Sequence, residues 1–138
     1  SESYPNFMTD DVFMPYEDDM TGGFVSLELP NQHLYAFNSE IFGEGESDGL
    51  WEYSYNRIYY YNVVIDDIMG ATQDTEEHKK QLRAEALVGR AFEYLTLVNA
   101  YANHYDPSTA ATDPGVPLML DKNINKTNLA ARYSAGSI

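Results

Sequence analysis

Three carboxylates in one short loop come closest to catalytic chemistry in residue type and spacing. Glu44, Glu46 and Asp48 alternate with small residues between Gly43 and Gly49. Glycoside hydrolysis requires two carboxyl groups held at a fixed separation on a rigid frame, one of them with a raised pKa. A glycine-spaced loop provides neither rigidity nor burial. We therefore interpret the loop as a solvated segment, with contact to ligand hydroxyls as the next alternative, and predict no catalytic residue.

Acidic and histidine side chains could also bind a metal ion. Neither the acidic loop nor the Asp-Asp pairs nearer the N-terminus have the spacing of an EF-hand calcium loop. His33, His78 and His104 are scattered, without the H-x-x-x-H or H-E-x-x-H spacing of zinc sites. The sequence has no cysteine, which excludes disulfides, thiolate chemistry and cysteine-ligated metals. We predict no metal site and no cofactor.

An aromatic residue beside the acidic loop is the best candidate for ligand contact. The flat face of Trp51 can stack on the C–H face of a pyranose ring, and Asp48 can accept hydrogen bonds from sugar hydroxyls. Trp51 also lies on the apolar stripe of a predicted helix, where core packing is the more common role. Both interpretations stay open. If the chain contacts a ligand, we expect Asp48 and Trp51 to make that contact.

Charge restricts the classes of partner. The 138 residues include 8 basic and 22 acidic side chains, giving a net charge of −14. A protein that neutralises a phosphate backbone needs a dense Lys/Arg surface, so we predict no nucleic-acid partner. An anionic lipid surface would repel this charge, and no apolar run approaches the roughly 20 residues that span a bilayer. Neutral ligands, cations and basic protein surfaces remain as partners.

Two long helices are the elements that must position these residues. The first is predicted over residues 50–69, because one stripe of side chains recurs at spacings of three and four: Trp51, Tyr55, Ile58, Asn62, Ile65 and Met69. The second is predicted over residues 75–102. The link at residues 70–74 is short, which favours an antiparallel helical hairpin.

The predicted second helix has an apolar face that one neighbour cannot cover, and it therefore needs partners on more than one side. The face comprises Ala84, Leu87, Val88, Ala91, Phe92, Tyr94, Leu95 and Val98. Gly89 lowers helix propensity in mid-helix, so we expect another backbone to approach closely there. We expect the side-chain amide of Asn62, on the first helix, to form a hydrogen bond to a loop. We expect Arg90 to pair with Glu93 or with the acidic N-terminal region.

The predicted fold class is all-α, with irregular segments on either side of the hairpin. Residues 1–49 are expected to form an irregular N-terminal segment, including a short strand at residues 24–29. Residues 50–102 form the hairpin. Residues 103–138 form a loop that leads toward helices missing from this chain. The whole is expected to be a partial domain of a larger α-helical fold.

Two adjoining motifs resemble the SusD/RagB family of outer-membrane nutrient-binding proteins. Residues 84–98, AEALVGRAFEYLTLV, resemble the family helix AEA-x-x-x-RA-[FY]-x-[FY]-x-x-LV. Residues 108–118, STAATDPGVPL, resemble the loop that ends in GVPL. The first helix is similar through Trp51, Tyr55 and Asn62, and residues 132–134 resemble an Arg-x-Ser turn.

This resemblance implies a tetratricopeptide-like scaffold and a function. Members bind a glycan or oligosaccharide at the extracellular face of the outer membrane and deliver it to a SusC-like TonB-dependent transporter, without catalysis. They are lipoproteins of polysaccharide utilization; the lipobox cysteine is absent from this chain, so membrane attachment would lie outside it. Members are several times longer, and residues 1–138 are therefore expected to be an N-terminal part. The alternative is a tetratricopeptide-like protein-interaction scaffold.

Overall fold

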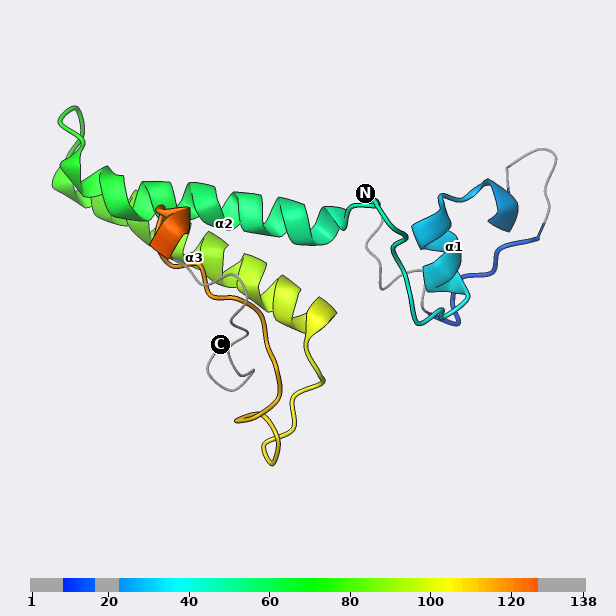
Figure 1. The fold of residues 1–138 in the computed structure, drawn as a ribbon. Coiled ribbons are helices and arrows are strands. Elements are labelled where there is room, and N and C mark those ends of the chain that lie inside the picture. The colour runs from blue at the N-terminus through cyan, green and yellow to red at the C-terminus, as the bar shows by residue number, and fades with distance from the viewer. Residues whose placement is uncertain (1–8, 17–22, 127–138) are drawn as a thin grey trace. The chain divides into compact units, whose positions relative to one another are not determined.

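The computed structural model describes residues 9–16 and 23–126 (Figure 1). These residues fall into two compact units, and the boundary between the units lies between Asp48 and Gly49. The described residues form helices and loops and contain no β-strand, so the prediction of an all-α fold is confirmed. The three α-helices are α1 (Leu29–Tyr35), α2 (Gly49–Asp67) and α3 (Glu76–Tyr101). Short 3-10 helices are η2 (Phe24–Ser26), η3 (Ile68–Gly70) and η4 (Ile124–Lys126).

A small aromatic cluster organises the described part of the first unit. The ring of Phe24 lies 6.2 Å from that of Tyr16 and 5.7 Å from that of Tyr35, measured between centroids. The Tyr35 hydroxyl accepts a hydrogen bond from the backbone N–H of Met14 at 3.1 Å. Leu34 on α1 is buried. These contacts hold the short helix against the loops that precede it.

The prediction of a strand at residues 24–29 is wrong. Phe24–Ser26 forms η2, and α1 begins at Leu29 with Pro30 in its first turn. Proline is favoured at this position because its missing N–H would have no helical partner there and its fixed φ already suits the helix. The alternation of apolar residues covers only six positions, and the preference of Pro30 for the first turn of a helix is the stronger local determinant.

In the second unit, α2 and α3 pack side by side as an antiparallel hairpin, with the link at one end (Figure 1). Their bounds lie within two residues of the predicted ones once η3 is counted with α2. Ile58 of α2 and Leu97 of α3 are completely buried at the interface, together with Val116 from the following loop. Removal of these apolar side chains from water stabilises the hairpin.

Side chains of the link cap the start of α3. The hydroxyl of Thr75 accepts a hydrogen bond from the backbone N–H of His78 at 3.2 Å, which satisfies one of the free donors of the first turn. The Asp74 carboxylate accepts the N–H of Thr75 at 2.7 Å and pairs with the His78 ring. The backbone bond from Thr75 is the largest cause of the lowered pKa of Asp74. Local sequence therefore fixes where the second helix begins.

The loop after α3 returns to the hairpin. Gly115, Val116 and Pro117 are buried, and the chain then runs back along both helices to η4 (Figure 1). Lys122 forms an ion pair with Asp67 at the end of α2. The apolar pair that precedes this point, Leu118 and Met119, packs against the hairpin core. The loop is thus a third component of the core rather than a free connection.

Gly89 is a point of close approach, but its neighbour is a side chain. A Cβ atom built on Gly89 would lie 2.4 Å from Cζ of Tyr61 and 2.7 Å from its hydroxyl oxygen. The expectation of a backbone at this position is therefore corrected to an aromatic ring from α2. With a larger residue at position 89, the Tyr61 ring or the helix would have to shift.

Candidate functional site

A fully buried amide joins the hairpin to the returning loop. Asn62 of α2 is 1% exposed, and its Nδ2 donates to the carbonyl of Met119 at 2.8 Å and to that of Asp121 at 3.4 Å. The guanidinium of Arg90 donates to Oδ1 of Asn62 at 2.7 Å and to the carbonyl of Leu120 at 3.5 Å. The predicted bond from Asn62 to a loop is confirmed, and every polar atom of its side chain has a partner.

The predicted pairing of Arg90 with Glu93 is wrong. Arg90 points to Asn62, whereas the buried carboxylate of Glu93 pairs with Arg57 across the hairpin at 3.3 Å. The two positions on α3 are three residues apart and could meet on an isolated helix. In the folded hairpin, the buried Asn62 oxygen and the buried Glu93 carboxylate each need a partner of their own, and this need decides the pairing.

Two tyrosine hydroxyls complete the attachment of the loop. The Tyr94 hydroxyl accepts the N–H of Met119 at 2.6 Å and donates to the carbonyl of the same residue at 3.0 Å. The Tyr55 hydroxyl donates to the carbonyl of Pro117 at 2.8 Å. Burial raises the pKa of Tyr94 above its usual value, because the charged phenolate is disfavoured away from water. These bonds give the irregular segment a fixed position on both helices.

Trp51, the predicted ligand contact, is half-buried in an aromatic cluster at the start of α2. Its ring centroid lies 4.8 Å from that of Tyr55, and 5.0 Å from that of Tyr101 in an edge-on arrangement at 89°. The cluster packs against the core that includes Ile58. Trp51 therefore takes part in hairpin packing, and a contact to ligand stays a prediction.

Asp48, the second predicted contact, is the last residue of the first unit and precedes α2. Its side chain is half-buried, whereas Glu44 and Glu46 of the same loop are exposed. The Glu46 carboxylate accepts the N–H of Gly43 at 2.7 Å, so the loop closes on itself. Because Asp48 and Trp51 belong to different units, their joint action on a ligand also stays a prediction.

The three histidines have separate surroundings. Nδ1 of His33 lies 2.9 Å from the carbonyl oxygen of Ile41, and His78 pairs with Asp74. His104 follows the end of α3. In the part of the chain that the structure describes, no three His, Asp or Glu side chains are grouped so as to hold a metal ion.

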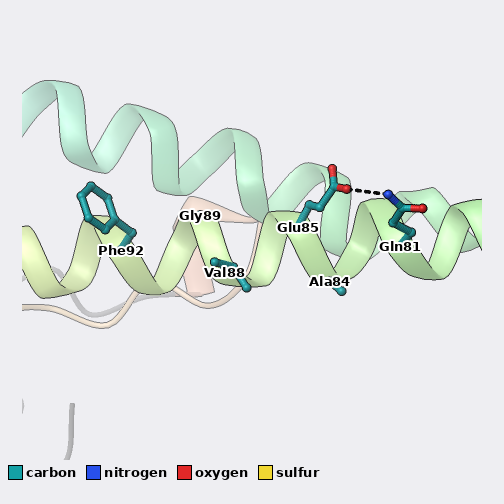
Figure 2. A pocket seen from close by; sticks show the side chains of 6 residues that line it. All are labelled: Gln81, Ala84, Glu85, Val88, Gly89 and Phe92. Carbon is teal, nitrogen blue, oxygen red and sulfur yellow. Dashed lines mark hydrogen bonds between the residues drawn. The ribbon is translucent and has the colours of Figure 1, made fainter.

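A depression of about 570 Å³ lies on α3 around Gly89 (Figure 2). Gln81 and Glu85, joined by a hydrogen bond of 2.9 Å, form one end of it, and Phe92 forms the other. Val88 is 70% exposed and Phe92 65% exposed, although both belong to the predicted apolar face. Of the predicted face, only Tyr94 is among the fully buried residues of α3, which are Lys79, Ala86, Glu93, Tyr94 and Leu97. Much of the apolar face is therefore available for contact.

A second, smaller hollow lies where α3 ends, and sequence reasoning missed it. It measures about 240 Å³ and is lined by Val98, Asn99, Ala102, Asn103, His104 and Tyr105. The last three residues follow the helix in a segment that composition assigns to a loop. The signal that could have revealed it is the run of amide, imidazole and phenol side chains immediately after a helix end.

The described residues of the second unit thus form a helical hairpin with depressions on its surface and an aromatic cluster at the start of α2. Residues 6–135 match the model of the SusD-like family, described as starch-binding and associating with the outer membrane, and the chain belongs to that family. No curated protein and no solved structure shows significant similarity to it. None of the described helices combines the length and apolar character needed to cross a membrane. The motif at residues 132–134 lies outside the described residues.

Proposed function

We propose that this chain belongs to a cell-surface protein that binds a glycan or oligosaccharide and delivers it to a SusC-like TonB-dependent transporter. The protein acts at the extracellular face of the outer membrane, where a lipid anchor holds it, and it catalyses no reaction. The match of residues 6–135 to a family of starch-binding, outer-membrane-associated proteins carries this proposal. The tetratricopeptide-like character of the larger scaffold is part of the same proposal.

The behaviour of the carboxyl groups supports binding without catalysis. A glycosidase needs a carboxyl group with a raised pKa to protonate the leaving oxygen. Among the described residues, the carboxyl groups with a shifted pKa all have it lowered, with hydrogen-bond donors as the largest cause: Asp74, Glu76, Asp106 and Asp121. A lowered pKa keeps a carboxylate charged, which suits capping and ion pairing but not proton donation.

Asp48 and Trp51 remain the residues that we propose for ligand contact. An aromatic side chain can cover the C–H face of a sugar ring, and a carboxylate can accept two hydroxyl hydrogen bonds. Trp51 is half-buried, so part of its surface stays accessible beside Tyr55 and Tyr101. A site of this kind binds a neutral sugar without needing positive charge, in agreement with the net charge of −14.

Calorimetric titration with neutral oligosaccharides tests the proposal. Maltoheptaose is the first probe, followed by xylo-, cello- and manno-oligosaccharides. Asp48→Asn should weaken binding by about tenfold, because it removes a charged acceptor of sugar hydroxyls. Glu44→Gln is the matched control in the same loop and should bind like the unaltered chain. Absence of heat with every oligosaccharide would contradict the proposal.

The exposed face of α3 favours a second candidate function, a protein-interaction scaffold. Val88, Phe92 and Leu95 are each more than half exposed, at 70%, 65% and 58%, and surfaces of this kind often contact another protein. The transporter could occupy the same face under the first proposal. Val88→Ser should weaken any protein contact there and leave oligosaccharide binding unchanged. Tight peptide binding by a chain that binds no oligosaccharide would favour the scaffold.

A further inference from the structure

The hollow at the end of α3 has the size of a subsite. At about 240 Å³ it is smaller than the roughly 300–1,000 Å³ typical of sites for drug-sized ligands. It is built by the last turn of the helix, from Val98 and Asn99, and by the residues that follow it, up to Tyr105. A hollow of this size matches a single ring or a group of similar bulk, not an extended chain.

One part of its lining is polar and keeps donor and acceptor atoms available for a ligand. Nδ2 of Asn99 donates to the carbonyl of Leu95 at 2.9 Å, which leaves its side-chain oxygen available. Asn103 and His104 make no side-chain hydrogen bond to any residue that the structure describes. Helix ends also leave their last carbonyls without a helical partner, and Asn99 is one of these residues. Donors and acceptors therefore occur together around the hollow.

The other part of its lining is apolar. Val98 and Ala102 contribute aliphatic surface from the helix, and Tyr105 contributes an aromatic ring that is 64% exposed. Tyrosine suits such a position, because its ring offers a flat apolar face and its hydroxyl stays hydrated. An apolar wall beside mixed donors and acceptors is the usual composition of a small-molecule site.

Electrostatics disfavour an anionic ligand in the hollow. The C-terminal end of a helix carries a partial negative charge, which disfavours phosphate and carboxylate groups. The net charge of −14 acts in the same direction. A cation, in turn, would find no carboxylate among the lining residues. A neutral ring with several hydroxyl groups and an apolar C–H face fits this lining, because it needs no charged partner.

We propose that the hollow lined by Asn99, Asn103, His104 and Tyr105 binds one neutral sugar ring. The amides and the imidazole bond its hydroxyl groups, and Tyr105 covers its C–H face. Neither Asp48 nor Trp51 lines this hollow, so the subsite is separate from the ligand contact proposed above. Its ligand class rests on the proposed function, while the position of the subsite rests on the hollow itself.

NMR titration of the 138-residue chain with maltoheptaose and the other neutral oligosaccharides tests this subsite. The amide and side-chain signals of residues 99–105 should shift on binding. Tyr105→Ala and Asn103→Leu should each weaken binding by about tenfold, as expected for loss of one ring contact or one to two hydrogen bonds. Tyr53→Ala is the matched control, because Tyr53 is 70% exposed on α2 and outside the hollow. Circular dichroism of every variant checks that helix content is retained.

The outcomes separate this inference from the proposed function. Weaker binding by Tyr105→Ala and Asn103→Leu, with Tyr53→Ala unchanged, supports the subsite. If the unaltered chain binds an oligosaccharide but both variants bind equally well and residues 99–105 do not shift, the subsite is overturned and the proposed function stands. If the unaltered chain binds none of the oligosaccharides, both are overturned.

Discussion

The Tyr94 hydroxyl bonds both backbone polar groups of Met119, accepting from its N–H at 2.6 Å and donating to its carbonyl at 3.0 Å. One side chain on α3 thereby satisfies both backbone hydrogen-bonding groups of Met119, as backbone groups of a neighbouring strand do in a β-sheet. Together with the bond from Asn62 to the same carbonyl, it fixes an irregular loop on two helices. The position of this loop depends on a few buried polar groups that can each be tested.

Tyr94→Phe should destabilise the second unit. The substitution keeps the aromatic ring but removes the oxygen that accepts the Met119 N–H, while the Met119 carbonyl keeps its bond from Asn62. Leaving a part-buried N–H without a partner costs about 1–3 kcal/mol. Chemical denaturation measures the loss, and amide exchange at Met119 should accelerate. Unchanged stability and unchanged exchange would show that the tyrosine does not hold the loop.

The raised pKa of Tyr94 predicts loss of stability at high pH. The folded chain holds its phenol proton more tightly than the unfolded chain, whose tyrosine titrates near the usual value of 10.0. This contribution is fully present below that value and is lost as pH rises through the higher folded pKa. Denaturation should therefore show a steeper decline above about pH 10 for the unaltered chain than for Tyr94→Phe. Parallel curves would contradict the assignment.

Gly89→Ala should destabilise the hairpin although alanine is the better helix former. The new Cβ would lie 2.4 Å from Cζ of Tyr61, so the ring or the helix must shift, which costs about 1–3 kcal/mol. In a Tyr61→Ala background the obstacle is gone, and the same change should stabilise by about 0.5–1 kcal/mol through helix propensity. Thermal melting of the unaltered chain, Gly89→Ala, Tyr61→Ala and the double variant measures the effect of the glycine substitution in both backgrounds. The same sign in both backgrounds would rule out the contact as the cause.

The pair of Arg57 and Glu93 should respond unequally to its two single substitutions. Glu93 is buried and Arg57 is largely exposed, so Arg57→Met leaves a buried carboxylate without its partner. Glu93→Gln removes the buried charge and leaves a solvated arginine. We expect Arg57→Met to cost about 1 kcal/mol more than Glu93→Gln, and the double variant to recover most of that difference. A double-mutant cycle by urea denaturation checks this order.

The two long helices could be predicted from sequence because their apolar spacing of three and four residues extends over five or more turns. Which side of α3 is buried could not be predicted from its wide apolar face. The hairpin buries the line through Ala86 and Leu97 and leaves Val88 and Phe92 exposed. Spacing favours Glu93 on the same helix or the acidic N-terminal region as the partner of Arg90, whereas the guanidinium bonds Asn62, which is 28 residues away. Local spacing contains no information on such distant pairs.

The candidate sites were less predictable than the helices. Trp51 was correctly placed on the apolar stripe, and its packing with Tyr55 and Tyr101 follows from that position. The run of polar and aromatic side chains after α3 was too weak a signal to predict the hollow, because Asn103 and Tyr105 resemble ordinary loop residues until the backbone brings them beside Val98. A surface of this kind forms where the chain turns at the end of a helix, and it can be recognised only once the fold is known.

Binding of a neutral glycan without its conversion is the central claim, and saturation-transfer NMR on the glycan tests it most directly. Protons of the protein are saturated, and the signals of maltoheptaose or of another neutral oligosaccharide are followed over hours. We predict transfer to the sugar C–H protons of at least one oligosaccharide, with constant anomeric signals throughout. Absence of transfer to every oligosaccharide, or growth of new reducing-end signals, would contradict the account.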